Sequence, residues 1–108
     1  MKKIIFASTH PMTTAQREDA LAIWGADATV REVYHTWTGI DSVRAVAEEC
    51  DILVGVFPLS LAMKMVWLRG LDAAKCDWAL EGVEFLRKVI CVDSQGHFVG
   101  TNGQKVYV

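Results

Sequence analysis

Apolar runs and polar loops alternate along the first part of the chain, in an order that predicts strands followed by helices. Residues 4–7 form an apolar run of strand length, and residues 14–24 carry apolar side chains at helical spacing. Thr13 and Gln16 have the spacing of a capping box, in which each side chain bonds the backbone N–H of the other residue. Gly25 is a typical helix stop. Both ends of this first helix are therefore marked in the sequence.

The middle of the chain repeats this order. Residues 29–34 are rich in β-forming side chains, and a second helix is expected to begin near Asp41. Residues 52–57 are apolar without alternation, which is typical of a strand covered on both faces in the middle of a parallel sheet. A helix that is apolar on nearly all sides follows over residues 61–69, and Gly70 is expected to end it.

The last third of the chain reads differently. Residues 71–86 fit either a short helix or an edge strand. Strands are expected at residues 87–93, 97–99 and 105–108, with a hairpin signal, Asn-Gly, before the last of them. Alternating strands and helices followed by hairpins predict an α/β fold, a Rossmann-like three-layer domain whose parallel central sheet is extended by a C-terminal antiparallel hairpin.

Composition adds an expectation about assembly. The chain has 108 residues, which predicts a single domain over residues 1–108, and 52% of them are hydrophobic. Exposed apolar helices are rare in monomers, so the helix over residues 61–69 is expected to form a homodimer interface. The alternative is a core helix covered by the C-terminal segment.

Net charge and cysteine content limit the kinds of binding partner and the cellular compartment that we expect. The net charge of −2 argues against binding duplex nucleic acid but is compatible with a small phosphorylated ligand. The apolar run over residues 52–63 is interrupted by Pro58 and Ser60, so no membrane association is expected. Three widely spaced cysteines are typical of reduced thiols, which favours a cytoplasmic protein.

Familiar catalytic and cofactor motifs are absent from the sequence. It contains no glycine-rich dinucleotide or phosphate loop, no serine nucleophile elbow, and no histidine or cysteine spacing typical of zinc. We therefore expect neither a cofactor nor a metal site.

Polar residues follow each predicted parallel strand, and such loops gather at one edge of a sheet. Helix N-termini face the same edge and favour anions, so a phosphate-bearing ligand is expected there, with Trp37 available to stack on a base. The alternative is that these hydroxyls only cap helices and that Trp37 packs on a loop. The candidate ligand-binding residues are Ser8, Thr9, Thr13, Thr14, Trp37, Thr38, Ser60, Lys64 and Arg69.

His10 is the candidate catalytic residue because it is the only titratable side chain in the first loop. Histidine is the commonest general acid or base near neutral pH. It could protonate a leaving oxygen, or it could only donate a hydrogen bond to a phosphate.

The opening IIFASTHPMTTAQ resembles the start of small stand-alone CRISPR-associated ring nucleases, in which a Ser-His-x-Leu-Thr-x-x-Gln-like pattern follows an apolar strand. Residues 9–16 occupy that pattern here, with Thr9 in place of the serine. The order of elements, with a buried middle strand before an apolar helix, is also similar. The resemblance implies a homodimeric Rossmann-like protein that binds a cyclic oligoadenylate across its two-fold axis; members of the family often cleave it, which ends an antiviral signal.

The resemblance also implies roles for individual residues. Thr9, His10 and Ser60 would hold phosphates, and Lys64 or Arg69 would supply positive charge. Cleavage would use a ribose 2′-hydroxyl held in line with the phosphate, together with a group that protonates the leaving oxygen.

Two other functions remain open from the sequence. Residues 3–8 and 50–54 are similar to parts of nucleoside deoxyribosyltransferases, although the acidic catalytic loop expected after the second of these strands is absent. A non-catalytic dimer that sequesters a nucleotide would need only the pocket.

Overall fold

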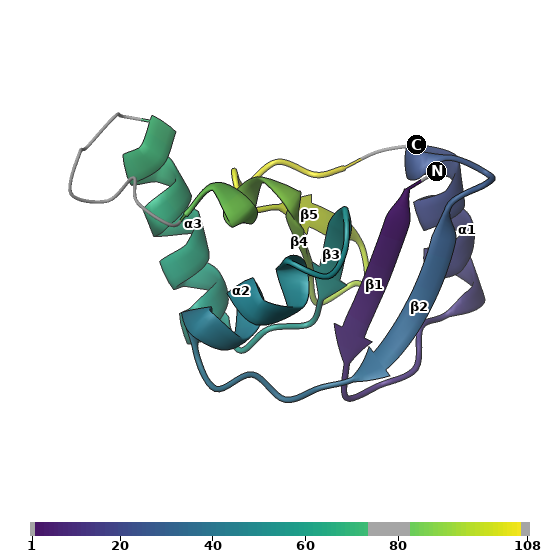
Figure 1. Cartoon of the computed structure of the whole chain (residues 1–108), viewed down its shortest axis with the longest axis horizontal. Helices are drawn as coiled ribbons and strands as arrows, with labels where there is room; N and C mark the ends of the chain where they lie inside the picture. The colour runs from purple at the N-terminus through teal and green to yellow at the C-terminus, as the bar shows by residue number, and fades with distance from the viewer. Residues whose placement is uncertain (1, 74–82, 107–108) are drawn as a thin grey trace.

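The computed structural model describes residues 2–73 and 83–106, whose strands form one five-stranded sheet (Figure 1). The elements, in chain order, are β1 (Lys3–Ser8), α1 (Thr14–Trp24), β2 (Thr29–Tyr34), α2 (Ile40–Ala47), β3 (Ile52–Gly55), α3 (Leu59–Ala73), the 3-10 helix η1 (Glu84–Lys88), β4 (Val89–Val92) and β5 (Phe98–Gly100). None of the helices in this part of the chain has the length and apolar character needed to cross a membrane.

The strand order is β2-β1-β3-β4-β5. The first four strands are parallel, and β5 is antiparallel to β4. The predicted α/β fold is therefore confirmed, including the antiparallel C-terminal extension. β3 lies in the middle of the sheet, as its unbroken apolar run indicated.

Helices cover both faces of the sheet, which gives the three layers that the sequence predicts (Figure 1). On one face, Ala20 of α1 packs with Ile4 and Val54. On the other face, residues of α2 and α3 pack around Leu53. Leu53 and Val54 are neighbours on β3 that point to opposite faces, and both are fully buried.

Helix α1 begins and ends where the sequence indicates. Thr13 Oγ1 accepts the N–H of Gln16 at 3.1 Å, and Gln16 Oε1 accepts the N–H of Thr13 at 3.0 Å, so the capping box is formed. Gly25 follows the last turn with φ of 124°, a backbone conformation that favours glycine, and its N–H bonds Leu21 O.

Two element boundaries differ from the predicted ones. Helix α3 starts two residues before the predicted residue 61 and runs through Gly70 to Ala73. A glycine in a helix interior costs only about 1 kcal/mol, so Gly70 alone does not end the helix. Strand β3 ends at Gly55, because the chain turns and brings the Phe57 ring against it. A Cβ on Gly55 would lie 2.5 Å from Phe57 Cζ.

The C-terminal prediction is partly right. β4 starts at Val89 rather than at residue 87, because the two preceding residues end η1. The last predicted strand, residues 105–108, contributes a single antiparallel bridge between Lys105 and Val99. Residues 71–86 fit either a short helix or an edge strand in the sequence, and residues 74–82 of that segment lie outside the described residues. The last two residues of the chain also lie outside them.

Two of the three cysteines fall in the described part of the chain, and both are free thiols. Burial raises the pKa of Cys50, and it raises the pKa of Cys91 to about 11. A thiol with a raised pKa is protonated at neutral pH and reacts slowly. Cys76 lies outside the described residues.

Arg69 and Thr101 join α3 to the C-terminal part of the sheet. Arg69 Nη1 donates to Thr101 Oγ1 at 2.8 Å, and the fully buried Thr101 hydroxyl donates to Leu86 O at 2.7 Å. Thr101→Val removes both bonds and leaves two polar groups without that partner. We expect it to lower the free energy of unfolding by about 1–3 kcal/mol, measured by urea denaturation. Thr101→Ser keeps the hydroxyl and is the control; equal stability of the two variants would contradict this role.

Candidate functional site

The loops that follow β1, β2 and β3 meet at one edge of the sheet, toward which the arrows of β1 and β2 point in Figure 1. Two backbone bonds join them. The His35 N–H donates to Ser8 O, and the Val56 N–H donates to Ala7 O, both at 3.3 Å. The parallel strand order thus brings the predicted loops to one edge. Their side chains, however, line two separate hollows.

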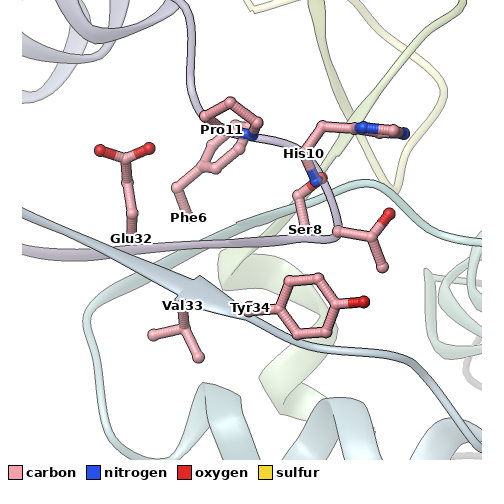
Figure 2. Close-up of a pocket in the computed structure, with 8 residues that line it drawn as sticks. Phe6, Ser8, His10, Pro11, Glu32, Val33 and Tyr34 are labelled. Carbon is pink, nitrogen blue, oxygen red and sulfur yellow. The ribbon is translucent and has the colours of Figure 1, made fainter.

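The first hollow lies at the ends of β1 and β2 and has a volume of about 190 Å³. Figure 2 shows Ser8 and Phe6 on one side of the strands and Val33 on the other. Ser8 is buried, and its Oγ accepts the backbone N–H of His10 at 3.0 Å, which fixes the start of the loop. The residue His10 is itself exposed. The lining residues are Phe6, Ser8, Thr9, His10, Pro11, Glu32, Val33 and Tyr34.

Glu32 gives this first hollow a negative side. Its carboxylate accepts the Met12 N–H at 2.7 Å and pairs with Arg17 at 2.9 Å, so it also holds the loop after β1 to β2. In Figure 2 the His10 ring points away from Glu32. The carboxylate and the imidazole therefore offer separate groups to a ligand.

The second hollow lies between the N-termini of α2 and α3 and has a volume of about 290 Å³. Ser60 and Lys64 are both exposed and lie four residues apart on α3, so they share one side of that helix. Two helix N-termini with a lysine and hydroxyls favour an anion. The lining residues are Trp37, Thr38, Gly39, Ile40, Pro58, Ser60, Leu61 and Lys64.

Trp37 is fixed in the loop that forms one wall of this second hollow. Its Nε1–H donates to Val56 O at 3.1 Å. Its ring centroid lies 4.3 Å from that of His35 and 4.8 Å from that of Phe57. Trp37 thus packs on a loop, which is the alternative that the sequence left open for it, and it also lines the second hollow.

The two hollows lie mainly on opposite faces of the sheet edge, although Val33 from the second face also lines the first hollow. The first contains Ser8, which lies on the face covered by α1, and the second lies between the helices of the other face. Side chains alternate between faces along a strand, so loops that meet at an edge still send their residues to two sides.

The ten candidate residues fall into three groups. Ser8, Thr9 and His10 line the first hollow, and Trp37, Thr38, Ser60 and Lys64 line the second. The others line neither: Thr13 caps α1, Thr14 is its exposed first residue, and Arg69 bonds Thr101 farther along α3.

Glu32 and Tyr34 line the first hollow but are not among the residues that the sequence singles out. Tyr34 pairs with Ser8 and Glu32 pairs with Phe6 in the parallel register, so each shares a face with its partner. Once the parallel pairing of the first two strands is assumed, that register could have identified both residues.

No group of three or more His, Cys, Asp or Glu side chains within the described ranges is placed to hold a metal ion. The comparisons with known proteins identify no family: no protein-family model matches the chain, and neither curated proteins nor solved structures gave a significant match. The structure itself shows a Rossmann-like α/β fold with a mostly parallel sheet and two hollows at the carboxyl edge.

Proposed function

We propose that this protein binds a cyclic oligoadenylate at the carboxyl edge of its sheet, as a homodimer, and cleaves it with the ribose 2′-hydroxyl as nucleophile. One observation carries the proposal. The second hollow combines a lysine, two hydroxyls and an indole ring at the N-termini of two helices. Those groups suit a ligand that has both phosphates and bases.

Lys64 is the principal phosphate-binding residue in this proposal. Its ammonium group shares a side of α3 with Ser60, so one phosphate can receive a charge-assisted bond and a hydroxyl bond together. The first N–H groups of α3 have no partner within the helix, and Ser60 and Leu61 of that first turn line the same hollow. These donors stabilise negative charge on an otherwise slightly acidic chain.

The proposed reaction is a transesterification. The ribose 2′-hydroxyl loses its proton to water and forms a bond to the adjacent phosphorus, while the bond from phosphorus to the 5′-oxygen breaks. The His10 imidazolium gives its proton to that leaving oxygen. The products are a 2′,3′-cyclic phosphate and a 5′-hydroxyl. The exposure of His10 at the edge of the first hollow supports this role.

The proposed homodimer rests on the exposed apolar side of α3. Leu59 is 76% exposed, Met63 63% and Trp67 56%, and these side chains border a largely apolar groove of about 760 Å³ that extends to β4 and β5. Contiguous exposed apolar patches on a monomer are often interaction sites.

We propose that a second copy of the chain covers this apolar groove, because the resulting two-fold symmetry matches that of the ring ligand. Lys64 is next to Met63 on α3, so the phosphate hollow borders the apolar side of the helix. A two-fold axis through α3 would bring the hollows of two subunits together. One symmetric ring with several phosphates would then bind both.

Incubation with cyclic tri-, tetra- and hexaadenylate tests the proposed function directly. Linear products that end in a 2′,3′-cyclic phosphate, identified by mass spectrometry, are the expected result. Tight binding without product would show that the protein sequesters the ring and does not cleave it. If no ring is bound or cleaved, the proposed function is wrong.

Met63→Glu is expected to convert the dimer to a monomer, because two carboxylates would have to be buried at the two-fold interface. Size-exclusion chromatography with light scattering measures the mass at micromolar concentration. Ala22→Glu adds the same charge to an exposed position on α1 and should leave the dimer intact. A wild-type chain that is monomeric under these conditions would overturn the interface.

A further inference from the structure

Tyr34 is an exposed aromatic residue at the mouth of the first hollow. It is the last residue of β2, pairs with Ser8 of β1, and is 76% exposed. A tyrosine ring is a flat surface on which a base can stack, and such stacking accepts any base. Tyr34 also lines the same hollow as the polar residues Ser8, Thr9 and His10, so a base stacked on its ring would lie next to hydrogen-bonding groups.

The charges of the first hollow suit the neutral part of a nucleotide better than its phosphate. Glu32 lines the hollow, whereas none of the described lining residues is Lys or Arg. Glu32 Oε2 pairs with Arg17 and Oε1 accepts the Met12 N–H, and each carboxylate oxygen can accept a further hydrogen bond. A carboxylate repels a phosphate but accepts hydrogen bonds from ribose hydroxyls and from the adenine amino group. The second hollow, which contains Lys64, has the opposite preference.

The polar groups and the size of the first hollow agree with this preference. The Ser8 side chain is buried in its wall, and its hydroxyl, after accepting the His10 N–H, still has a proton to donate. A base offers ring nitrogens that accept such a proton. The volume of about 190 Å³ is below that of a site for a whole drug-sized ligand, so it fits one base or one ribose.

We propose that the first hollow is a nucleoside subsite, in which one adenine stacks on Tyr34 and its polar edge meets Ser8 and Glu32. This inference rests on the proposed function for its choice of adenine. It places the 5′-oxygen of that nucleoside, the leaving oxygen of the proposed reaction, beside His10, and it assigns the other phosphates of the ring to the hollow with Lys64.

Saturation-transfer NMR with adenosine tests the subsite without any phosphate. Transfer to the adenine protons is expected for the wild type and for Tyr34→Phe, which keeps the ring, and is expected to be lost in Tyr34→Ala. Inorganic phosphate should not displace adenosine, and ribose 5-phosphate should give much weaker transfer. Absence of transfer in the wild type, or equal transfer in Tyr34→Ala, would overturn the proposal.

The same variants separate this inference from the proposed function. With a cyclic oligoadenylate, Tyr34→Ala should bind about 5- to 100-fold more weakly, as expected for the loss of one stacked base. If the wild type cleaves the ring and Tyr34→Ala binds it with unchanged affinity, the proposed nucleoside subsite is wrong, whereas the proposed nuclease activity is supported. If adenosine binds through Tyr34 but no ring is bound, the subsite stands and the nuclease is wrong.

Discussion

His10→Ala is expected to lower the rate of ring cleavage by about 10²- to 10⁴-fold and to leave the binding affinity nearly unchanged, because the imidazole acts only when the leaving oxygen takes a proton. The substitution preserves the loop, since the contact that fixes it is the backbone N–H of this residue on Ser8 Oγ. Single-turnover assays with saturating protein measure the rate apart from binding.

His97→Ala is the matched control for this prediction. His97 is also exposed, lies between β4 and β5, and donates its backbone N–H to Asp93 Oδ1. It lines neither hollow at the carboxyl edge. Cleavage by this variant should match that of the wild type. If His10→Ala also cleaves at the wild-type rate, His10 has no part in the reaction.

Lys64→Gln is expected to raise the dissociation constant for the cyclic oligoadenylate about 10- to 100-fold, because a hydrogen bond to a charged group contributes about 1.5–3 kcal/mol. Calorimetric titration measures the affinity. The variant should also show a weaker dependence of affinity on salt concentration, since one charge that attracts the ligand is gone.

Lys105→Gln removes the same charge from an exposed residue that lines neither hollow and that bridges to β5. Its affinity for the ring should stay close to that of the wild type. Equal losses in the two variants would mean that net charge, rather than a phosphate site at α3, attracts the ligand.

The fold could be predicted from the sequence because its signals are local. The capping box of Thr13 and Gln16 fixes the start of α1, and the unbroken apolar run of β3 indicates a strand covered on both faces. The end of α3 was predicted wrongly because Gly70 is a local stop signal. That signal is weak, because a glycine inside a helix costs only about 1 kcal/mol.

The site could be predicted less completely, because it depends on contacts between distant residues. The parallel order predicts that the loops meet, but which face each residue joins follows from strand register, so one expected cleft is two hollows. Glu32 and Tyr34 were missed for the same reason. The sequence presents Arg69 as a positive charge for a phosphate, whereas in the structure it donates a hydrogen bond to Thr101, which is distant in the sequence.

Titration of the wild-type protein with cyclic tri-, tetra- and hexaadenylate, with the stoichiometry determined for the ring that binds, tests the central claim most directly. The claim is that two copies of this chain bind one ring at the carboxyl edges of their sheets. The predicted result is saturable binding of one ring by two chains at micromolar concentrations. Absence of binding by all three rings would contradict the claim.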